Sequence, residues 1–183
     1  MGLSPEWAFS ELYGFEEEML GFVPQPVMAL ILNAEYRKKR AERPQGSLQT
    51  VNKYYMKQTG ELDNACGVIA ALHAVYNSMG EGKVSLLPDS VLANFFKQVQ
   101  SQTPAERATS LENFQAFKKE YRSVANKGQS SQERPTTHHF TAFVVNEAGQ
   151  LIELCGCKTG PVVIKEASDN VLKDAAAEIL RRV

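Results

Sequence analysis

Cys66 stands at the head of the apolar run "CGVIAALHAV", directly after a short stretch that contains Asp63 and Asn64. If either of these two residues caps a helix that begins here, the thiol lies in the first turn of that helix. The unpaired N–H groups and the dipole at that end favour an anion and lower the pKa of a thiol. The position therefore suits a nucleophile, although a small cysteine in an apolar core would give the same pattern.

A thiol nucleophile needs a base to take its proton, and this base is usually a histidine. His73 follows Cys66 on the same expected helix, about 10 Å along the axis, which is too far for proton transfer, so we interpret His73 as structural. His138 and His139 lie where the polar loop 125–137 meets a buried strand, a common location for catalytic groups. Side chains alternate along a strand, so only one of the pair can point inward. The pattern alone does not decide which one.

An acyl-transfer site also needs hydrogen-bond donors for the oxyanion. The backbone N–H of Cys66 can supply one donor. Gln58, at the end of an expected strand before the helix, is a candidate for the second. The alternative interpretation of Gln58 is a surface amide.

Hydrophobic periodicity and capping residues predict the elements that must position these groups. A buried helix is expected over 68–76 with Cys66 at its head, and the two adjacent histidines should open the first strand of a β-hairpin. The other expected elements are one or two short helices within 4–26, strands at 27–33 and 53–59, helices at 86–102 and 103–124, hairpin strands at 138–145 and 150–154, and a helix at 168–183.

Composition indicates one globular domain over residues 1–183, because the chain is 43% hydrophobic and has no internal linker. Its net charge of −1 gives no indication of a nucleic acid or a membrane as partner. Three cysteines form an odd set, and no signal peptide precedes them, so we expect free thiols and a cytoplasmic location. The longest apolar stretch, "VMALIL", is far too short to span a bilayer.

Several separated motifs occur in a distinctive order: "YYMKQT", "NACGVIAALHAVYN", "TPAERATSLEN", "HHFTAFVV", "GQLIEL" and "VLKDAA". Together they resemble the ubiquitin carboxyl-terminal hydrolase family of cysteine proteases, over nearly the whole chain. The resemblance implies an α/β (α+β) papain-like fold, with a central, largely antiparallel sheet flanked by helices. It also implies that Cys66 is the nucleophile, His139 the general base and Gln58 the oxyanion donor. The loop 125–137 would pass over the site and limit the size of the leaving group.

Three departures from the family pattern bear on activity. Cys155 and Cys157 in "ELCGC" replace the acid and the arginine of an "ELDGR"-like motif. The segment between Gln58 and Cys66 is two residues longer than usual. Both ends of the chain are shorter than usual, so the sheet can lack a terminal strand.

The hairpin suggests where the replacement for the acid lies. If Val145 pairs with Gly149 across a three-residue loop, Cys155 faces His139. A neutral thiol is a weak hydrogen-bond acceptor, so it would orient the histidine poorly. Glu153, on the same strand face, could substitute in part.

The sequence therefore predicts a thiol-dependent deubiquitinase with impaired activity, which hydrolyses ester, thioester or amide bonds at the carboxyl-terminal glycine of ubiquitin. The alternative is a catalytically inactive, ubiquitin-binding pseudoenzyme. A third hypothesis is a zinc site made of His138, His139, Cys155 and Cys157, but such spacing on straight strands aligns ligands without surrounding an ion. We expect no metal and no cofactor, with ubiquitin or a ubiquitin-like protein as the partner of a monomer.

Overall fold

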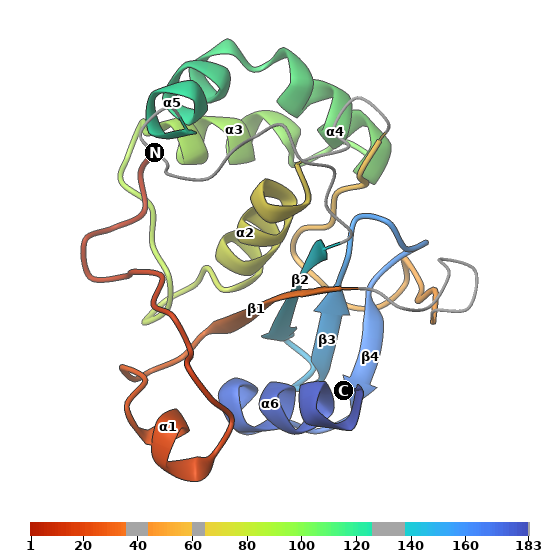
Figure 1. Ribbon diagram of the computed structural model, residues 1–183. Coiled ribbons are helices and arrows are strands. Elements are labelled where there is room, and N and C mark those ends of the chain that lie inside the picture. Colours follow the sequence, from red (N-terminus) through yellow and green to blue (C-terminus); the bar gives the residue numbers. More distant parts are fainter. Residues whose placement is uncertain (36–43, 60–64, 126–137, 183) are drawn as a thin grey trace.

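A four-stranded antiparallel sheet forms the centre of the molecule (Figure 1). A computed structural model describes residues 1–35, 44–59, 65–125 and 138–182. Within them, the sheet has the order β1-β2-β3-β4, and helices flank it, as the predicted fold class requires. The strands are β1 (Ala29–Glu35), β2 (His138–Val145), β3 (Leu151–Leu154) and β4 (Val162–Lys165). The helices are α1 (Glu17–Gly21), α2 (Cys66–Asn77), α3 (Val91–Val99), α4 (Pro104–Asn113), α5 (Gln115–Ala125) and α6 (Val171–Arg182).

The two faces of the sheet are covered by different helices (Figure 1). Ala142 and Val144 of β2 pack with residues of α2, whereas Phe143 between them packs with residues of α6. Successive side chains of β2 thus point to opposite faces of the sheet, and both faces of this strand are buried. Helix α2 is consequently apolar nearly all round, because α3, α4 and α5 cover its other side.

In the helical layer, α3 lies within the helix expected over 86–102, α4 begins where the helix expected over 103–124 should begin, and one prediction is corrected. Ser90 caps α3, and Thr103 caps α4 in a capping box with Glu106. The single helix expected over 103–124 is wrong, because α4 and α5 are separate. Phe114 between them leaves the helical conformation, with ψ at 91°, and its ring packs 5.3 Å from that of Phe95.

The expected strand at 53–59 is also wrong, because this segment forms no ladder. The N–H groups of Lys53 and Tyr54 donate to the side-chain oxygen of Asn77, and the N–H of Met56 donates to the ring of His73. Side chains of α2 thus satisfy backbone donors that a neighbouring strand would otherwise take. The segment 53–58 is extended and largely buried without belonging to the sheet.

The amino-terminal region contains only the short helix α1. One short helix lies within the expected range 4–26, and residues 5 and 6 form only a turn, in which the N–H of Trp7 donates to the carbonyl of Ser4 at 2.9 Å. Long-range backbone bonds hold the first residues: the N–H of Ser4 donates to the carbonyl of Ser85, and the N–H of Leu87 donates to the carbonyl of Gly2. The strand expected at 27–33, the helix at 68–76 and the helix at 168–183 correspond to β1, α2 and α6.

The β2–β3 hairpin is present, but its predicted register is wrong by two residues. Val145 pairs with Leu151 rather than with Gly149, because Asn146 and Gln150 form one further pair across the loop. Gly149 takes the left-handed conformation at φ 76° within that loop. A shift of two keeps every side chain on its expected face. Strand β4, which pairs with β3, is absent from the predicted elements.

None of the helices in the described ranges combines the length and the apolar character that crossing a bilayer requires.

Candidate active site

Cys66 is the first residue of α2 and is partly buried. Asp63 and Asn64, the expected caps, lie outside the described residues, and Ala65 occupies the cap position without a side-chain bond. A hydrogen bond with His139 lowers the pKa of the Cys66 thiol. Burial acts in the opposite direction, while backbone hydrogen bonds from the start of α2 and from β2 add to the lowering. The contact with His139, together with the backbone N–H at the helix start, therefore favours the thiolate.

His139 is the histidine that points inward. It is partly buried near the start of β2, whereas its neighbour His138 is exposed. Burial opposes the charge of the His139 ring, but hydrogen bonds with Cys157 and Cys66 outweigh it and raise the pKa to about 9. The pair of Cys66 and His139 thus has the composition of a thiolate–imidazolium pair, the reactive form of a thiol hydrolase.

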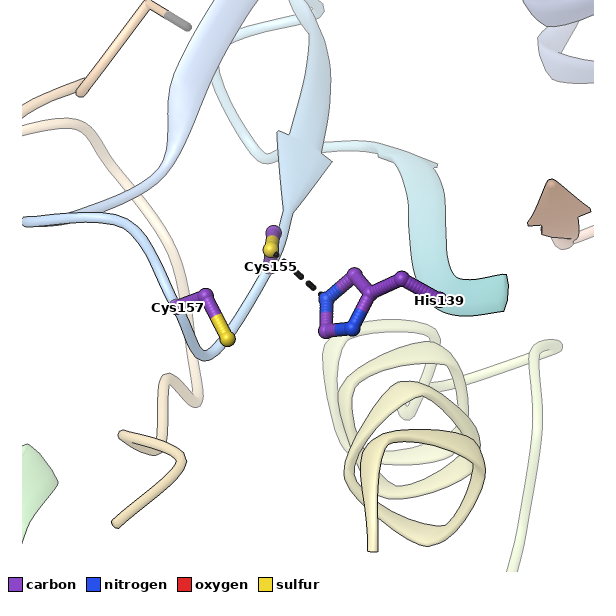
Figure 2. Close-up of side chains that lie close together, drawn as sticks. All are labelled: His139, Cys155 and Cys157. Carbon is purple, nitrogen blue, oxygen red and sulfur yellow. Dashed lines mark hydrogen bonds between the residues drawn. The ribbon is translucent and has the colours of Figure 1, made fainter. Parts of the chain in front are cut away.

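Cys155 occupies the place where an orienting acid would be found. Its Sγ lies 3.1 Å from Nε2 of His139 (Figure 2). A hydrogen bond with Cys157 and burial both raise the pKa of the Cys155 thiol far above its ordinary value. Cys155 is only 1% exposed, so it contacts His139 as a neutral thiol. The predicted proximity is present despite the wrong register, because the shift of two preserves the face.

A tight turn after β3 brings Cys155 and Cys157 together. The N–H of Lys158 donates to the carbonyl of Cys155 at 3.0 Å. The N–H of Gln58 donates to Gly156 at 2.9 Å, and a Cβ at Gly156 would lie only 2.8 Å from that nitrogen. Glycine is therefore required for this close approach. The side-chain oxygen of Gln58 lies 3.5 Å from the Cys157 sulfur, so the candidate oxyanion donor borders the thiol cluster.

Two residues to which the sequence assigned no role hold this turn. The hydroxyl of Tyr55 lies 2.6 Å from the carbonyl oxygen of Cys155 and 2.9 Å from that of Lys158. Arg107 donates to the carbonyl of Tyr55 at 2.9 Å. Tyr55 belongs to the quoted motif "YYMKQT", but nothing local in that motif indicates a contact with a turn a hundred residues later.

His73 is structural, as predicted. Its ring is fully buried, accepts a hydrogen bond from the N–H of Met56 at 3.0 Å and stacks on Tyr55 at 5.2 Å. Burial lowers its pKa to about 4. The ring is therefore neutral at physiological pH, with its proton on Nδ1 because Nε2 is the acceptor.

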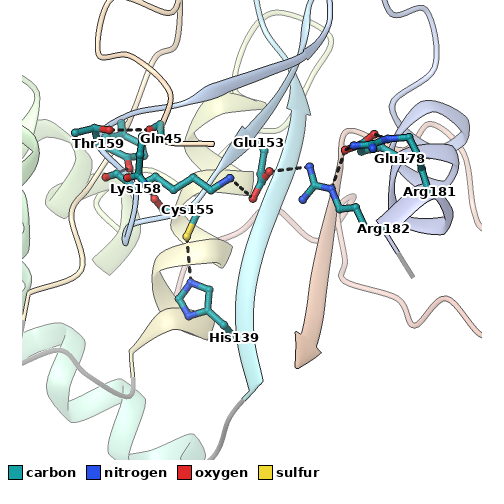
Figure 3. Close-up of polar contacts among 10 residues, drawn as sticks. Gln45, His139, Glu153, Cys155, Lys158, Thr159, Glu178, Arg181 and Arg182 are labelled. Atoms are coloured by element: carbon teal, nitrogen blue, oxygen red, sulfur yellow. Dashed lines mark hydrogen bonds and ion pairs between the residues drawn. The ribbon is translucent and has the colours of Figure 1, made fainter. Parts of the chain in front are cut away.

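Glu153 does not substitute for the missing acid. Its carboxylate is 1% exposed and forms ion pairs at 2.9 Å with Lys158 and with Arg182 (Figure 3). Both oxygens are engaged by cations, so the carboxylate is committed away from His139. That part of the sequence-based expectation is wrong. The loop expected to cover the site, residues 125–137, lies outside the described residues except for Ala125 at the end of α5.

The potential metal ligands in this part of the chain are His139, Cys155 and Cys157. One ligand atom of each lies within 4.8 Å of the others. His138 belongs to the four-residue zinc set weighed from the sequence, but it is exposed and outside this group.

Comparisons with known proteins point to one family. The sequence model described as "Ubiquitin carboxyl-terminal hydrolase, family 1" matches residues 1–183. Ubiquitin carboxyl-terminal hydrolase isozyme L1 of Rattus norvegicus is 34% identical over 188 residues, which cover 99% of this chain and 82% of the relative. The Homo sapiens isozyme is 35% identical over 184 residues, covering 96% and 80%. The crystal structure of the Trichinella spiralis UCH37 catalytic domain bound to ubiquitin vinyl methyl ester has a TM-score of 0.71 at 20% identity, covering 93% of this chain and 75% of that one.

Proposed function

The chain belongs to the ubiquitin carboxyl-terminal hydrolase family, and we propose that Cys66 and His139 perform the thiol-dependent hydrolysis of this family at the carboxyl-terminal glycine of ubiquitin. One observation carries the proposal: Cys66, at the first residue of α2, hydrogen-bonds with the imidazole of His139 on β2. The position at the start of α2 and the contact with His139 favour the thiolate of Cys66, and the inward-facing His139 can carry the proton.

In this mechanism, the Cys66 thiolate attacks the carbonyl carbon of the terminal glycine. The backbone N–H groups at the start of α2 and the side-chain amide of Gln58 stabilise the resulting oxyanion. His139 then protonates the leaving amine, alcohol or thiol, and afterwards removes a proton from the water that releases ubiquitin. The contact between the side-chain oxygen of Gln58 and Cys157 leaves the NH₂ group as the donor of that amide.

The proposed hydrolase is weak, because a neutral thiol replaces the carboxylate that would orient His139. Cys155 lies at hydrogen-bond distance from Nε2 but carries no charge to balance the imidazolium. A thiol that is already ionised depends less on this partner than a serine hydroxyl does. The same observation supports the second candidate function, a ubiquitin-binding pseudoenzyme.

The proposal covers residues 1–183 as a single catalytic domain with ubiquitin as its partner. The family match over this range supports it, as does the similar Trichinella spiralis structure, which is bound to ubiquitin vinyl methyl ester. A monomeric state, a cytoplasmic location and the absence of a resident metal or cofactor stay predictions.

Ubiquitin with a carboxyl-terminal vinyl methyl ester tests the function. We expect wild-type protein to gain the mass of one ubiquitin and to hydrolyse a ubiquitin ester slowly. Cys66→Ala should do neither while binding ubiquitin within about tenfold of wild type, because removing a nucleophile need not disturb docking. His139→Ala should lose most of the hydrolysis.

The matched control is His138→Ala, which removes the exposed neighbour and should leave the adduct and the hydrolysis unchanged. Ubiquitin binding without any adduct would support the pseudoenzyme instead. An adduct that still forms on Cys66→Ala would refute the proposed nucleophile.

A further inference from the structure

The group formed by His139, Cys155 and Cys157 has a geometry that the proposed hydrolysis does not require. The three side chains point toward one another (Figure 2), and their ligand atoms lie within 4.8 Å. The shortest separation, 3.1 Å, joins Nε2 of His139 to Sγ of Cys155. One imidazole and two thiols form the Cys₂His ligand set that zinc-type ions prefer.

The scaffold holds these ligands before any ion binds. Cys155 and Cys157 lie on one turn that is closed by its own backbone hydrogen bond and held by the hydroxyl of Tyr55. Gly156, between the two cysteines, packs against the backbone of Gln58. The ligand spacing that argued against a metal assumed straight strands, but β3 ends at Leu154 and the turn redirects the second sulfur.

The distances suit a tetrahedral ion after a small contraction. Bonds of about 2.3 Å to sulfur and about 2.0 Å to nitrogen place neighbouring ligand atoms roughly 3.5 Å apart. Cys155 is buried, whereas His139 and Cys157 are partly exposed. The group is therefore open on one side, through which an ion can enter.

The charges also balance. Two thiolates and one neutral imidazole around a divalent ion carry no net charge, which limits the cost of partial burial. The ammonium group of Lys158, the residue after Cys157, is held by the buried carboxylate of Glu153 at 2.9 Å (Figure 3). This ion pair offsets the positive charge of Lys158.

We propose that His139, Cys155 and Cys157 form a Cys₂His binding site for Zn²⁺, and that its occupation reversibly inhibits the hydrolase. Binding releases the two thiol protons and the Nε2 proton of the His139 imidazolium to solvent, forms two Zn–S bonds, and forms one Zn–N bond through the lone pair that Nε2 then carries. The neutral imidazole keeps its remaining proton on the other nitrogen, so it has no free lone pair to accept another proton. His139 then can no longer cycle between imidazolium and imidazole, and it cannot remove a proton from the attacking water. Water completes the coordination.

The inhibition rests on the proposed function, whereas the metal site does not. Metal-free protein titrated with Co²⁺ or Cd²⁺ should develop thiolate-to-metal charge-transfer absorption that saturates at one equivalent, and Zn²⁺ should displace either ion. Loss of a group that only supports a metal ligand already weakens binding about 10- to 100-fold, so loss of a ligand should cost at least as much. We therefore expect His139→Ala and Cys157→Ser each to weaken binding at least that much.

Two controls separate the site from its neighbours. His138→Ala removes the adjacent exposed histidine and should keep full affinity. Cys66→Ala should still bind one equivalent, so a metal site can be detected even if the proposed hydrolysis proves wrong. Circular dichroism checks the fold of each variant, and Cys157 is only partly buried, so Cys157→Ser should fold like wild type.

Activity gives the second readout. Saturating Zn²⁺ should suppress most of the ubiquitin-ester hydrolysis by wild-type protein, and a chelator should restore it. Residual activity of Cys157→Ser should resist the same concentration of Zn²⁺. Equal inhibition of Cys157→Ser would show that the ion acts on Cys66 and His139 alone, and unchanged metal affinity in both ligand variants would overturn the site.

Discussion

At the level of individual residues, the site consists of two successive polar contacts: Cys66 hydrogen-bonds with His139, and His139 in turn contacts Cys155. Each contact is at hydrogen-bond distance, but the last member has the wrong chemistry for a triad. A carboxylate accepts strongly and balances the imidazolium charge, whereas a neutral thiol does neither. The geometry of a triad is therefore present without its electrostatics.

Cys155→Asp should restore that charge. We expect kcat for ubiquitin-ester hydrolysis to rise at least about tenfold, because loss of a triad acid costs up to roughly 10⁴-fold in serine proteases. Cys155→Asn is the matched control, since it has nearly the same size without the charge, and it should give no increase. Equal kcat for both variants and wild type would mean that another group already serves His139.

Among the secondary-structure elements, α2 does more than present Cys66. Its side chains Asn77 and His73 accept hydrogen bonds from the backbone of the segment 53–58, which carries Gln58 and Tyr55. The helix therefore orders the segment that in turn holds the Cys155–Lys158 turn. A buried, neutral His73 is the central part of this support.

His73 should make folding stability depend on pH. Burial lowers its folded-state pKa to about 4 from an ordinary value of 6.5, so between these values the unfolded state binds more protons. Its contribution is complete above about pH 6.5 and is lost as the pH falls toward 4. We expect the free energy of unfolding to fall by about 2 kcal/mol between about pH 7.5 and about pH 5 from this residue.

Urea denaturation of wild type and His73→Gln at both pH values measures this effect. Glutamine can accept the same backbone hydrogen bond but does not titrate, so the variant should lose less stability on acidification. Parallel losses in the two proteins would contradict a neutral, buried His73.

Across the molecule as a whole, Glu153 joins three parts of the carboxyl-terminal region: β3, the turn after it and the end of α6. Its buried carboxylate pairs with Lys158 beyond the turn and with Arg182 at the end of α6 (Figure 3). The carboxyl-terminal helix, the sheet and the turn that carries the two cysteines are thus tied at one point. The ion pairs of Glu153 therefore contribute both to the stability of the fold and to the position of the turn that carries Cys155.

Lys158→Met should therefore be strongly destabilising. It leaves a buried carboxylate with one of its two cations, and breaking such a pair costs about 3 to 5 kcal/mol. The matched control is Lys165→Met, which breaks the more exposed pair of Lys165 with Asp174 and should cost less than about 1 kcal/mol. Chemical denaturation measures the free energy of unfolding of both variants. Similar losses in the two would show that the buried ion pair contributes no more to stability than the exposed one.

The features of this protein that depend on near neighbours could be predicted from its sequence. The apolar run after Cys66 predicts a buried helix with the thiol at its start. The alternating segments around 146–149 predict the hairpin, and the spacing of apolar residues predicts α6. The family motifs point to His139, Cys155 and Gln58. All of these signals are local, because periodicity, capping and short motifs each act over a few residues.

Contacts that form only when the chain packs could not be predicted from local patterns in the sequence, and the tertiary structure alone reveals them. The pattern could not choose between His138 and His139. It also predicted a strand at 53–59, because a backbone donor satisfied by Asn77 or His73 leaves no local signal. It likewise assigned Glu153 to the wrong partner, since the cations that hold it come from the turn and from α6. Such choices depend on which groups are buried together and must be paired there, and burial is set by the tertiary structure as a whole.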